Sequence, residues 1–334
     1  MQPAISILLP ARNAAATLDA CWRSILRQTE PDWECVLVDD GSDDTTLARA
    51  RALARHEPRL VVVAAPHRGI VGALEHGLAR CRGELVARMD ADDVMHRDRL
   101  RAQRAALDAR PVLAAVGCQV RLFPRAGVGP GLRAYERWLN GLVTPDAIRT
   151  EAYVECPVAH PTLMVRRTAL AALGYRACQW PEDYDLVLRL LARGWEIGNV
   201  PRRLLGWRNH SSRLTWHDAR YGLDRFTACK AAFLADGLLA ASERYVLWGY
   251  GETGHALRRA LLAHGKRPSH IVELHPGRLG NVIHGAPVIA PDAVALDRHR
   301  PLVASVAGAE ARAQIRTALV ARGFRELRDF VCAA

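Results

Sequence analysis

The sequence lacks the long apolar segments and the paired cysteines that would identify a membrane-spanning or disulfide-bonded protein. No apolar run approaches the roughly 20 residues that a membrane-spanning helix needs. The eight cysteines are scattered without a Cys-x-x-Cys pair, so neither a zinc site nor a disulfide framework is expected. A strand predicted at residues 5–9 leaves no place for a signal peptide. We therefore expect a protein of the reducing cytoplasm.

A recognised nucleic-acid-binding motif is also missing, although the net charge is +11. The arginines that carry most of this charge are spread along predicted helices rather than clustered, so nucleic acid is not an expected partner. A basic surface also attracts anionic lipid headgroups and phosphorylated substrates. Peripheral contact with the inner face of the membrane is compatible with this charge.

The first hundred residues alternate short apolar strands with amphipathic helices. Strands are predicted at residues 5–9, 34–38, 60–64 and 85–89, and helices at residues 16–27, 45–56 and 70–80. This alternation predicts an α/β fold with a doubly wound, largely parallel sheet. Ligands of such sheets bind at the carboxyl ends of the strands.

Three carboxylates, those of Asp90, Asp92 and Asp93, follow the fourth predicted strand. Such a cluster persists most easily where a cation neutralises it. Asp90 and Asp92 are two positions apart, so on an extended segment they point to the same side. They would offer oxygen ligands to Mg2+ or Mn2+, which could hold a diphosphate. The alternative for an isolated Asp-x-Asp is an acidic turn that merely ends a strand.

Polar residues follow the first two predicted strands as well. Arg12 and Asn13 follow the first, and residues 39–44 (DDGSDD) follow the second. Three strand ends that bring polar groups to one edge of a sheet favour a nucleotide site over three unrelated turns.

Several segments resemble the family 2 glycosyltransferases of GT-A fold. They are residues 6–13 (SILLPARN), 24–29 (SILRQT), 38–43 (VDDGSD), 88–93 (RMDADD), 160–162 (HPT), 174–175 (GY), 182–186 (EDYDL) and 207–210 (WRNH). No single segment is very specific, but together they follow the family's order and spacing over residues 4–215. Two departures concern donor preference: Arg97 stands where the family often has proline, and residues 67–69 (HRG) stand where it often has Asn or Gly.

The resemblance implies a metal-dependent, inverting glycosyltransferase that uses Mn2+ or Mg2+. The donor would be a nucleotide sugar, with UDP as the default, and the acceptor a glycan or a lipid-linked sugar in cell-surface polysaccharide synthesis. The implied metal ligands are Asp92 and Asp90, with His210 as a further metal or diphosphate contact. An ordinary surface histidine remains the alternative for His210.

The same resemblance implies the donor-binding and catalytic residues. The donor-binding residues would be Pro10, Arg12, Asn13, Asp39, Asp40, Asp90 and Arg208. Asp183 would be the base that deprotonates the acceptor hydroxyl, with Glu182 as the second choice. Acidic residues after Pro181 also fit an ordinary helix start, and the two interpretations are compatible.

A second β-α pattern near the C-terminus carries a glycine motif. Its glycines are Gly249, Gly251 and Gly254, placed after a predicted strand and before a predicted helix. This is the dinucleotide-binding fingerprint, and Glu273 at the end of the next strand stands where a ribose contact is expected. The module is only half of a complete dinucleotide fold, so a structural or regulatory role of the glycines is favoured over catalysis.

The predicted organisation is therefore a GT-A domain at residues 1–215, a linking helix at 216–242 and a small Rossmann-like α/β domain at 243–334. The alternative function is a nucleotide-dependent oxidoreductase or a nucleotide-sugar sensor centred on the C-terminal glycine motif. A sugar nucleotidyltransferase would share the sheet, but its glycine-rich, Arg-containing N-terminal loop is absent.

Overall fold

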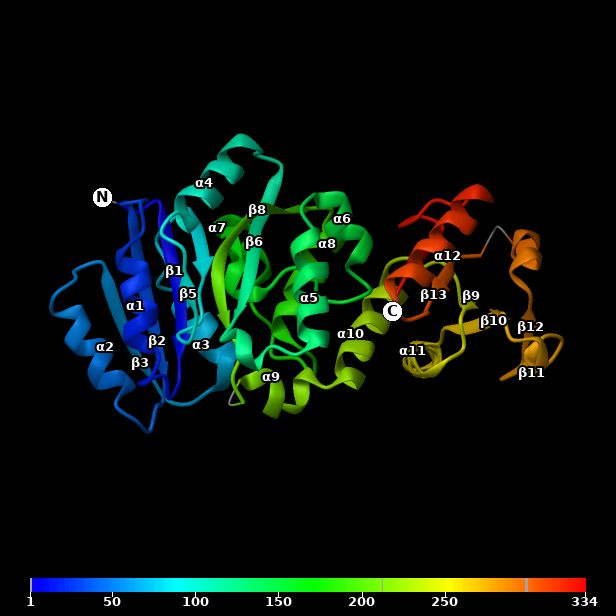
Figure 1. Cartoon of the computed structure of the whole chain (residues 1–334), viewed down its shortest axis with the longest axis horizontal. Helices are drawn as coiled ribbons and strands as arrows, with labels where there is room; N and C mark the ends of the chain where they lie inside the picture. The colour runs from blue at the N-terminus through cyan, green and yellow to red at the C-terminus, as the bar shows by residue number, and fades with distance from the viewer. Residues whose placement is uncertain (1, 212, 298–299) are drawn as a thin grey trace. The chain divides into compact units, whose positions relative to one another are not determined.

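The computed structural model describes residues 2–211, 213–297 and 300–334, which form two units with separate sheets (Figure 1). The first unit comprises Met1–Arg149, Pro157–Cys178 and Asp185–His217. The second comprises Thr150–Cys156, Gln179–Tyr184 and Asp218–Ala334. The predicted division after residue 215 lies close to this boundary, but the sequence pattern did not indicate the two short segments that the second unit takes from the N-terminal half.

The first unit contains an eight-stranded mixed sheet in the order β3-β2-β1-β4-β7-β6-β8-β5. Its strands are β1 (Ile5–Ala11), β2 (Trp33–Asp40), β3 (Leu60–Ala65), β4 (Leu85–Arg88), β5 (Val94–Met95), β6 (Leu113–Phe123), β7 (Met164–Arg166) and β8 (Glu196–Arg208). The first four are parallel neighbours, as the sequence predicts, whereas β7 and β5 run antiparallel to their partners. The long strands β6 and β8 were not predicted, and in β8 the exposed Arg202 and Arg203 interrupt the apolar pattern.

Helices cover this sheet and leave its strands deeply buried. Up to residue 217 they are α1 (Leu18–Leu26), α2 (Thr46–Ala54), α3 (Gly69–Leu78), α4 (Arg99–Ala109), α5 (Pro130–Gly141), α6 (Pro145–Glu151), α7 (Arg167–Leu173), α8 (Glu182–Ala192) and α9 (Leu214–His217). Every residue of β1 and β2 is buried, as expected for parallel strands with both faces covered. The polar residues beyond these strands are therefore held at one rigid edge of the sheet.

The second unit contains a six-stranded sheet in the order β11-β12-β10-β9-β13-β14. Its strands are β9 (Arg244–Trp248), β10 (Arg267–Val272), β11 (Val282–Ile283), β12 (Ala286–Ile289), β13 (Leu302–Ala304) and β14 (Phe330–Cys332), and its helices are α10 (Leu223–Asp236), α11 (Glu252–Leu262) and α12 (Ala309–Ala321). Short 3-10 helices span Arg125–Gly127, His160–Thr162, Ala219–Tyr221, Pro276–Arg278 and Pro291–Asp297 along the chain. The five parallel strands, counted in chain order, read 3-2-1-4-5, which is the order of doubly wound dinucleotide-binding sheets.

The predicted linking helix at 216–242 is shorter in the structure. Helix α10 spans Leu223–Asp236, with Gly222 at its N-cap and Gly237 at its C-cap. Glycine ends helices readily because it adopts backbone conformations that other residues avoid. Among the described residues, no helix combines the length and apolarity needed to cross a membrane.

The glycine motif of the second unit forms the turn between β9 and α11. Gly249 has a positive φ of 92°, and a Cβ on Gly254 would lie 2.1 Å from the Gly249 carbonyl oxygen. These two glycines are therefore required by the turn itself, whereas Gly251 faces open space. Glu273 accepts a hydrogen bond from the Tyr250 N–H (3.0 Å) and so holds this turn. A ribose contact of Glu273 stays a prediction.

Candidate active site

Three carboxylates meet where β4 ends. The ligand oxygens of Asp90, Asp92 and Asp93 all lie within 4.8 Å of one another. Asp93 is buried at 1% exposure, while Asp90 and Asp92 are half-buried. The structure therefore forms the acidic cluster that the Asp-x-Asp spacing predicts.

The partners of Asp90 and Asp92 differ in charge. The buried guanidinium of Arg88 forms an ion pair with Asp90. Arg88 is itself held by Arg99, a completely buried residue whose Nη2 donates to the Arg88 carbonyl oxygen (2.7 Å). Asp92 instead has the His210 Nε2 at 2.7 Å from its Oδ2. Since Asp90 already faces a permanent cation, Asp92 is the carboxylate better placed to take up another one.

Asp93, which the sequence left without a role, joins two strand ends. Its Oδ1 accepts the N–H of Arg208 (2.8 Å), and the Arg208 Nε donates to the Asp92 carbonyl oxygen (2.6 Å). These bonds connect the end of β4 to the end of β8 and so bring His210 to Asp92. Both of these hydrogen bonds hold Arg208 beside the acidic cluster.

The environment of the second carboxylate oxygen of Asp93 favours a bound cation at the cluster. Asp93 Oδ2 is buried and has no hydrogen-bond partner in the part of the chain that the structure describes. Burial raises the pKa of Asp93 well above its ordinary value; the charges of Asp90 and Asp92 add to this, and the Arg208 N–H and the Arg213 guanidinium oppose it. A hard divalent cation prefers such carboxylate oxygens and would relieve their repulsion. The donor set therefore fits Mg2+ or Mn2+.

Arg213 is a further positive group near the cluster that the sequence did not single out. Its guanidinium lies 4.5 Å from the Trp207 ring centroid. Burial raises the pKa of Asp90, and the Arg88 and Arg213 charges act against this rise. Arg213 thus adds positive charge beside the three carboxylates.

Asp39 and Asp40 are the last two residues of β2, which β1 separates from β4, and they have different surroundings. Asp40 accepts the N–H of Arg68 (2.8 Å) and lies 2.8 Å from the His67 Nδ1. Asp39 accepts the Ser42 N–H (3.2 Å) through Oδ2, while its buried Oδ1 finds no hydrogen-bond partner among residues 2–211, 213–297 and 300–334. Asp40 therefore orders the loop after β3, and Asp39 keeps an acceptor for a ligand.

The residues predicted at the end of β1 take different positions. Asn13 has a positive φ of 50°, and its Oδ1 accepts the Asp43 N–H (2.9 Å), which ties this loop to the loop after β2. Arg12 is exposed, whereas Pro10 is buried inside β1. Arg12 and Asn13 are thus accessible to a ligand, and Pro10 acts through the strand that carries them.

Glu182 and Asp183 begin α8 in a segment that belongs to the second unit. Glu182 is buried at 2% exposure and accepts hydrogen bonds from the Tyr221 hydroxyl at 3.0 and 2.8 Å. Burial raises the pKa of Tyr221, and the charges of Glu182 and Asp183 raise it further, so the hydroxyl stays a donor. Asp183 is the more accessible carboxylate of the pair. Tyr221 was missed because no local pattern links it to residues so far back in the chain.

The remaining motif residues of the first unit form buried supporting contacts. His160 Nε2 lies 3.0 Å from the Tyr175 hydroxyl, and Asp185 pairs with Arg189 at 2.6 Å. Arg189 also donates to the Gly174 carbonyl oxygen (2.8 Å). Burial lowers the pKa of His160 well below its ordinary value, with the Arg88 charge adding to this. These contacts tie together segments within the first unit.

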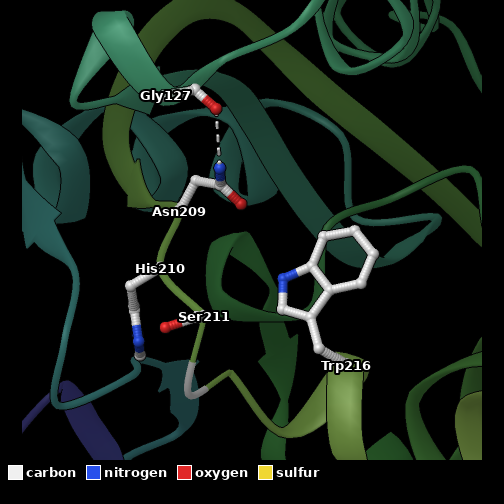
Figure 2. Close-up of a pocket in the computed structure, with 5 residues that line it drawn as sticks. All are labelled: Gly127, Asn209, His210, Ser211 and Trp216. Atoms are coloured by element: carbon white, nitrogen blue, oxygen red, sulfur yellow. Dashed lines mark hydrogen bonds between the residues drawn. The ribbon is translucent and has the colours of Figure 1, made fainter.

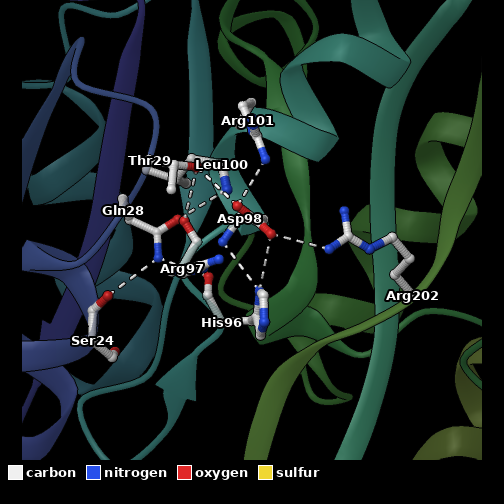
Figure 3. Close-up of polar contacts among 9 residues, drawn as sticks. All are labelled: Ser24, Gln28, Thr29, His96, Arg97, Asp98, Leu100, Arg101 and Arg202. Atoms are coloured by element: carbon white, nitrogen blue, oxygen red, sulfur yellow. Dashed lines mark hydrogen bonds and ion pairs between the residues drawn. The ribbon is translucent and has the colours of Figure 1, made fainter.

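The motif at residues 24–29 holds the segment that follows the acidic cluster (Figure 3). Gln28 Nε2 donates to the His96 carbonyl oxygen (2.8 Å), and its Oε1 accepts the Leu100 N–H (3.1 Å). Asp98 lies between Arg101 (2.9 Å) and Arg202 (3.2 Å). The segment just after α1 is thereby bonded to the chain that runs from β5 into α4.

Gln28→Ala is expected to destabilise the protein by about 1 to 3 kcal/mol, because it leaves the buried Leu100 N–H without an acceptor. The His96 carbonyl still accepts the Arg99 N–H (3.0 Å). Urea unfolding followed by circular dichroism measures this change. Arg23→Ala, an exposed substitution on the preceding helix α1, is the control and should cost less than about 0.5 kcal/mol. Equal unfolding midpoints for the two variants would show that the Gln28 bonds do not stabilise the segment.

Comparisons with other proteins agree with this geometry. The sequence model of Glycosyl transferase family 2 matches residues 6–174. EpsE of Bacillus subtilis, named as a glycosyltransferase, is 29% identical over 238 residues, which cover 68% of this chain and 82% of EpsE. The amylovoran biosynthesis glycosyltransferase AmsE of Erwinia amylovora is 29% identical over 203 residues, 60% of this chain and 74% of AmsE.

Two solved structures share the fold. The mannosyltransferase PcManGT of Pyrobaculum calidifontis, in complex with GDP-Man and Mn2+, has a TM-score of 0.55 at 19% sequence identity. The match covers 98% of this chain and 82% of the PcManGT chain. The structure of S. aureus TarS residues 1–349 in complex with UDP has a TM-score of 0.54 at 16% sequence identity. The match covers 78% of this chain and 71% of the TarS chain. At these identities the likeness concerns the fold alone.

Proposed function

This chain belongs to glycosyl transferase family 2, and from that premise we propose a metal-dependent enzyme that transfers a sugar with inversion from a nucleotide diphosphate to a glycan or lipid-linked acceptor. The observation that carries the proposal is the cluster of Asp90, Asp92 and Asp93 with His210 at one edge of the GT-A sheet. Family membership favours the transferase over an oxidoreductase or sensor.

The donor end of the proposed site is built by unit-one residues at the ends of β2, β4 and β8. Asp92, with Asp90 and the free oxygen of Asp93, would hold Mn2+ or Mg2+, and His210 would be a further contact. A cation bound there neutralises the diphosphate and makes it a better leaving group. The unpaired Oδ1 of Asp39 would accept a hydrogen bond from the nucleoside. The charges of Arg208 and Arg213 would attract the diphosphate.

The proposed base is Asp183. It would take the proton of the acceptor hydroxyl as that oxygen bonds to the anomeric carbon, on the face opposite the departing diphosphate. The bond between the anomeric carbon and the diphosphate oxygen breaks in the same displacement, which inverts the configuration. Glu182, bonded to Tyr221, would position the start of α8 rather than move the proton.

The candidate substrates are taken from the similar proteins described above. PcManGT binds GDP-Man and TarS binds UDP, so nucleotide sugars of both bases are donors to test. AmsE carries the name of an amylovoran biosynthesis glycosyltransferase, which supports a role in cell-surface polysaccharide assembly.

A thermal-shift screen of UDP-GlcNAc, UDP-glucose and GDP-mannose, with and without Mn2+, tests the proposal. We expect at least one donor to raise the melting temperature by several degrees with Mn2+, since a ligand at about 100 times its Kd stabilises by about 2.7 kcal/mol. The shift should disappear when EDTA removes the metal. If every donor leaves the melting temperature unchanged with Mn2+, the assignment of a metal-dependent donor site is wrong.

A further inference from the structure

A cavity of about 480 Å³ adjoins the Asp92–His210 pair (Figure 2). It is lined by Gly127, Asn209, His210, Ser211 and Trp216, all of the first unit. Volumes of this size are typical of small-molecule sites. We name it the Trp216 pocket. Because His210 lines it and also contacts Asp92, a molecule in the pocket would lie next to the proposed diphosphate site.

Asn209 presents an unused acceptor in this pocket. Its Nδ2 donates to the Gly127 carbonyl oxygen (3.2 Å), which fixes the orientation of the amide. Its Oδ1 is buried, has no hydrogen-bond partner within the described chain, and points toward the side of the pocket where Trp216 lies (Figure 2). An unpaired buried acceptor costs free energy, and a ligand that donates a hydrogen bond would remove this cost.

Trp216 presents an aromatic ring at the same pocket. It lies on α9 and is 55% exposed, so its ring is open to a molecule in the pocket. An aromatic face packs well against the C–H face of a sugar ring, while the ring hydroxyls at its rim seek polar partners. An exposed indole beside an amide oxygen therefore suits a hydroxyl-rich ring. It does not suit a phosphate, which an amide oxygen repels.

We propose that the Trp216 pocket binds a pyranose ring, which stacks on Trp216 and donates a hydroxyl hydrogen bond to Asn209 Oδ1. This assignment rests on the proposed function and makes Trp216 and Asn209 determinants of sugar specificity. The pyranose is either the donor's sugar or the terminal sugar of the acceptor, and the two arms of the experiment distinguish them.

The first arm measures donor binding by calorimetry with Mn2+, using UDP, UDP-GlcNAc, GDP and GDP-mannose. If the donor sugar occupies the pocket, Trp216→Ala weakens the nucleotide sugar by about tenfold and leaves the free nucleotide within about twofold. Trp216→Phe keeps a ring and should recover most of the affinity. Leu214→Ala removes an exposed side chain of the same helix outside the pocket and should change neither ligand. Asn209→Ala should follow Trp216→Ala.

The second arm uses methyl glycosides of glucose, galactose, mannose and N-acetylglucosamine, detected by saturation-transfer NMR on protein with Mn2+ and nucleotide. Loss of their ring-proton signals in Trp216→Ala, with unchanged nucleotide-sugar affinity, assigns the pocket to the acceptor. Unchanged affinities and unchanged signals in both arms overturn the pocket assignment. A wild-type protein that binds no nucleotide with Mn2+ contradicts the proposed function instead, and the glycoside signals still decide for or against the pocket.

Discussion

Asp92→Asn is expected to lower the rate of sugar transfer by about 1,000-fold, because losing the proposed principal carboxylate ligand would remove several kcal/mol of charge stabilisation from the leaving diphosphate. The substitution is nearly isosteric and keeps an oxygen near His210, so the fold should persist. Transfer from the donor identified by the screen measures the rate. Calorimetric titration of Mn2+ in the presence of the free nucleotide measures the loss of metal affinity.

Two further carboxylates serve as controls for this variant. Asp43 is exposed in the loop after β2, so Asp43→Asn should leave the rate within about twofold. Asp90→Asn should have an intermediate effect, since Asp90 is already neutralised in part by Arg88. Wild-type transfer by Asp92→Asn, together with unaltered Mn2+ titration, would remove Asp92 from the metal site.

Asp183→Asn should reduce transfer by about 100- to 10,000-fold, the usual contribution of a general base, while the donor affinity stays unchanged. The asparagine keeps the side-chain size and still accepts the Tyr184 N–H that Asp183 now accepts at 2.7 Å. Single-turnover transfer and calorimetric donor binding together separate the chemical step from binding.

Glu182→Gln is the matched variant for this second experiment. It retains an acceptor for the Tyr221 hydroxyl and should lower transfer far less than Asp183→Asn. A larger effect at Glu182 than at Asp183 would move the base to Glu182. Loss of donor binding in Asp183→Asn would contradict the assignment of Asp183 as a base.

The strands and the acidic cluster were predictable because local patterns determine them. The alternation of apolar strands and amphipathic helices predicted β1 to β4, and the spacing of Asp90 and Asp92 predicted one acidic cluster at a strand end. By contrast, β8 was missed because exposed arginines at positions 202 and 203 interrupt its apolar residues. The burial of such a strand depends on its neighbours as well as its own pattern.

Two hydrogen-bonded pairs, one in each unit, were beyond the reach of local patterns. Tyr221 bonds to Glu182 and His67 lies against Asp40, although 39 and 27 positions separate them in the chain. The positions of loops and strand ends in the folded chain determine such pairs. A periodic sequence pattern does not indicate which loop will contact which other loop. Residues 67–69, which depart from the usual family sequence, thus have a structural role: His67 and Arg68 both hydrogen-bond to Asp40.

The sequence by itself determined the family, the α/β architecture and the carboxylates that can hold a cation, because each depends on residue type and short spacing. Only the tertiary structure decided how those carboxylates differ. Arg88 neutralises Asp90, Arg208 ties Asp93 to β8, and Asp92 meets His210. The order β4-β7-β6-β8 places these strand ends at one edge of the sheet, and contacts across a folded sheet assign separate roles to three identical side chains.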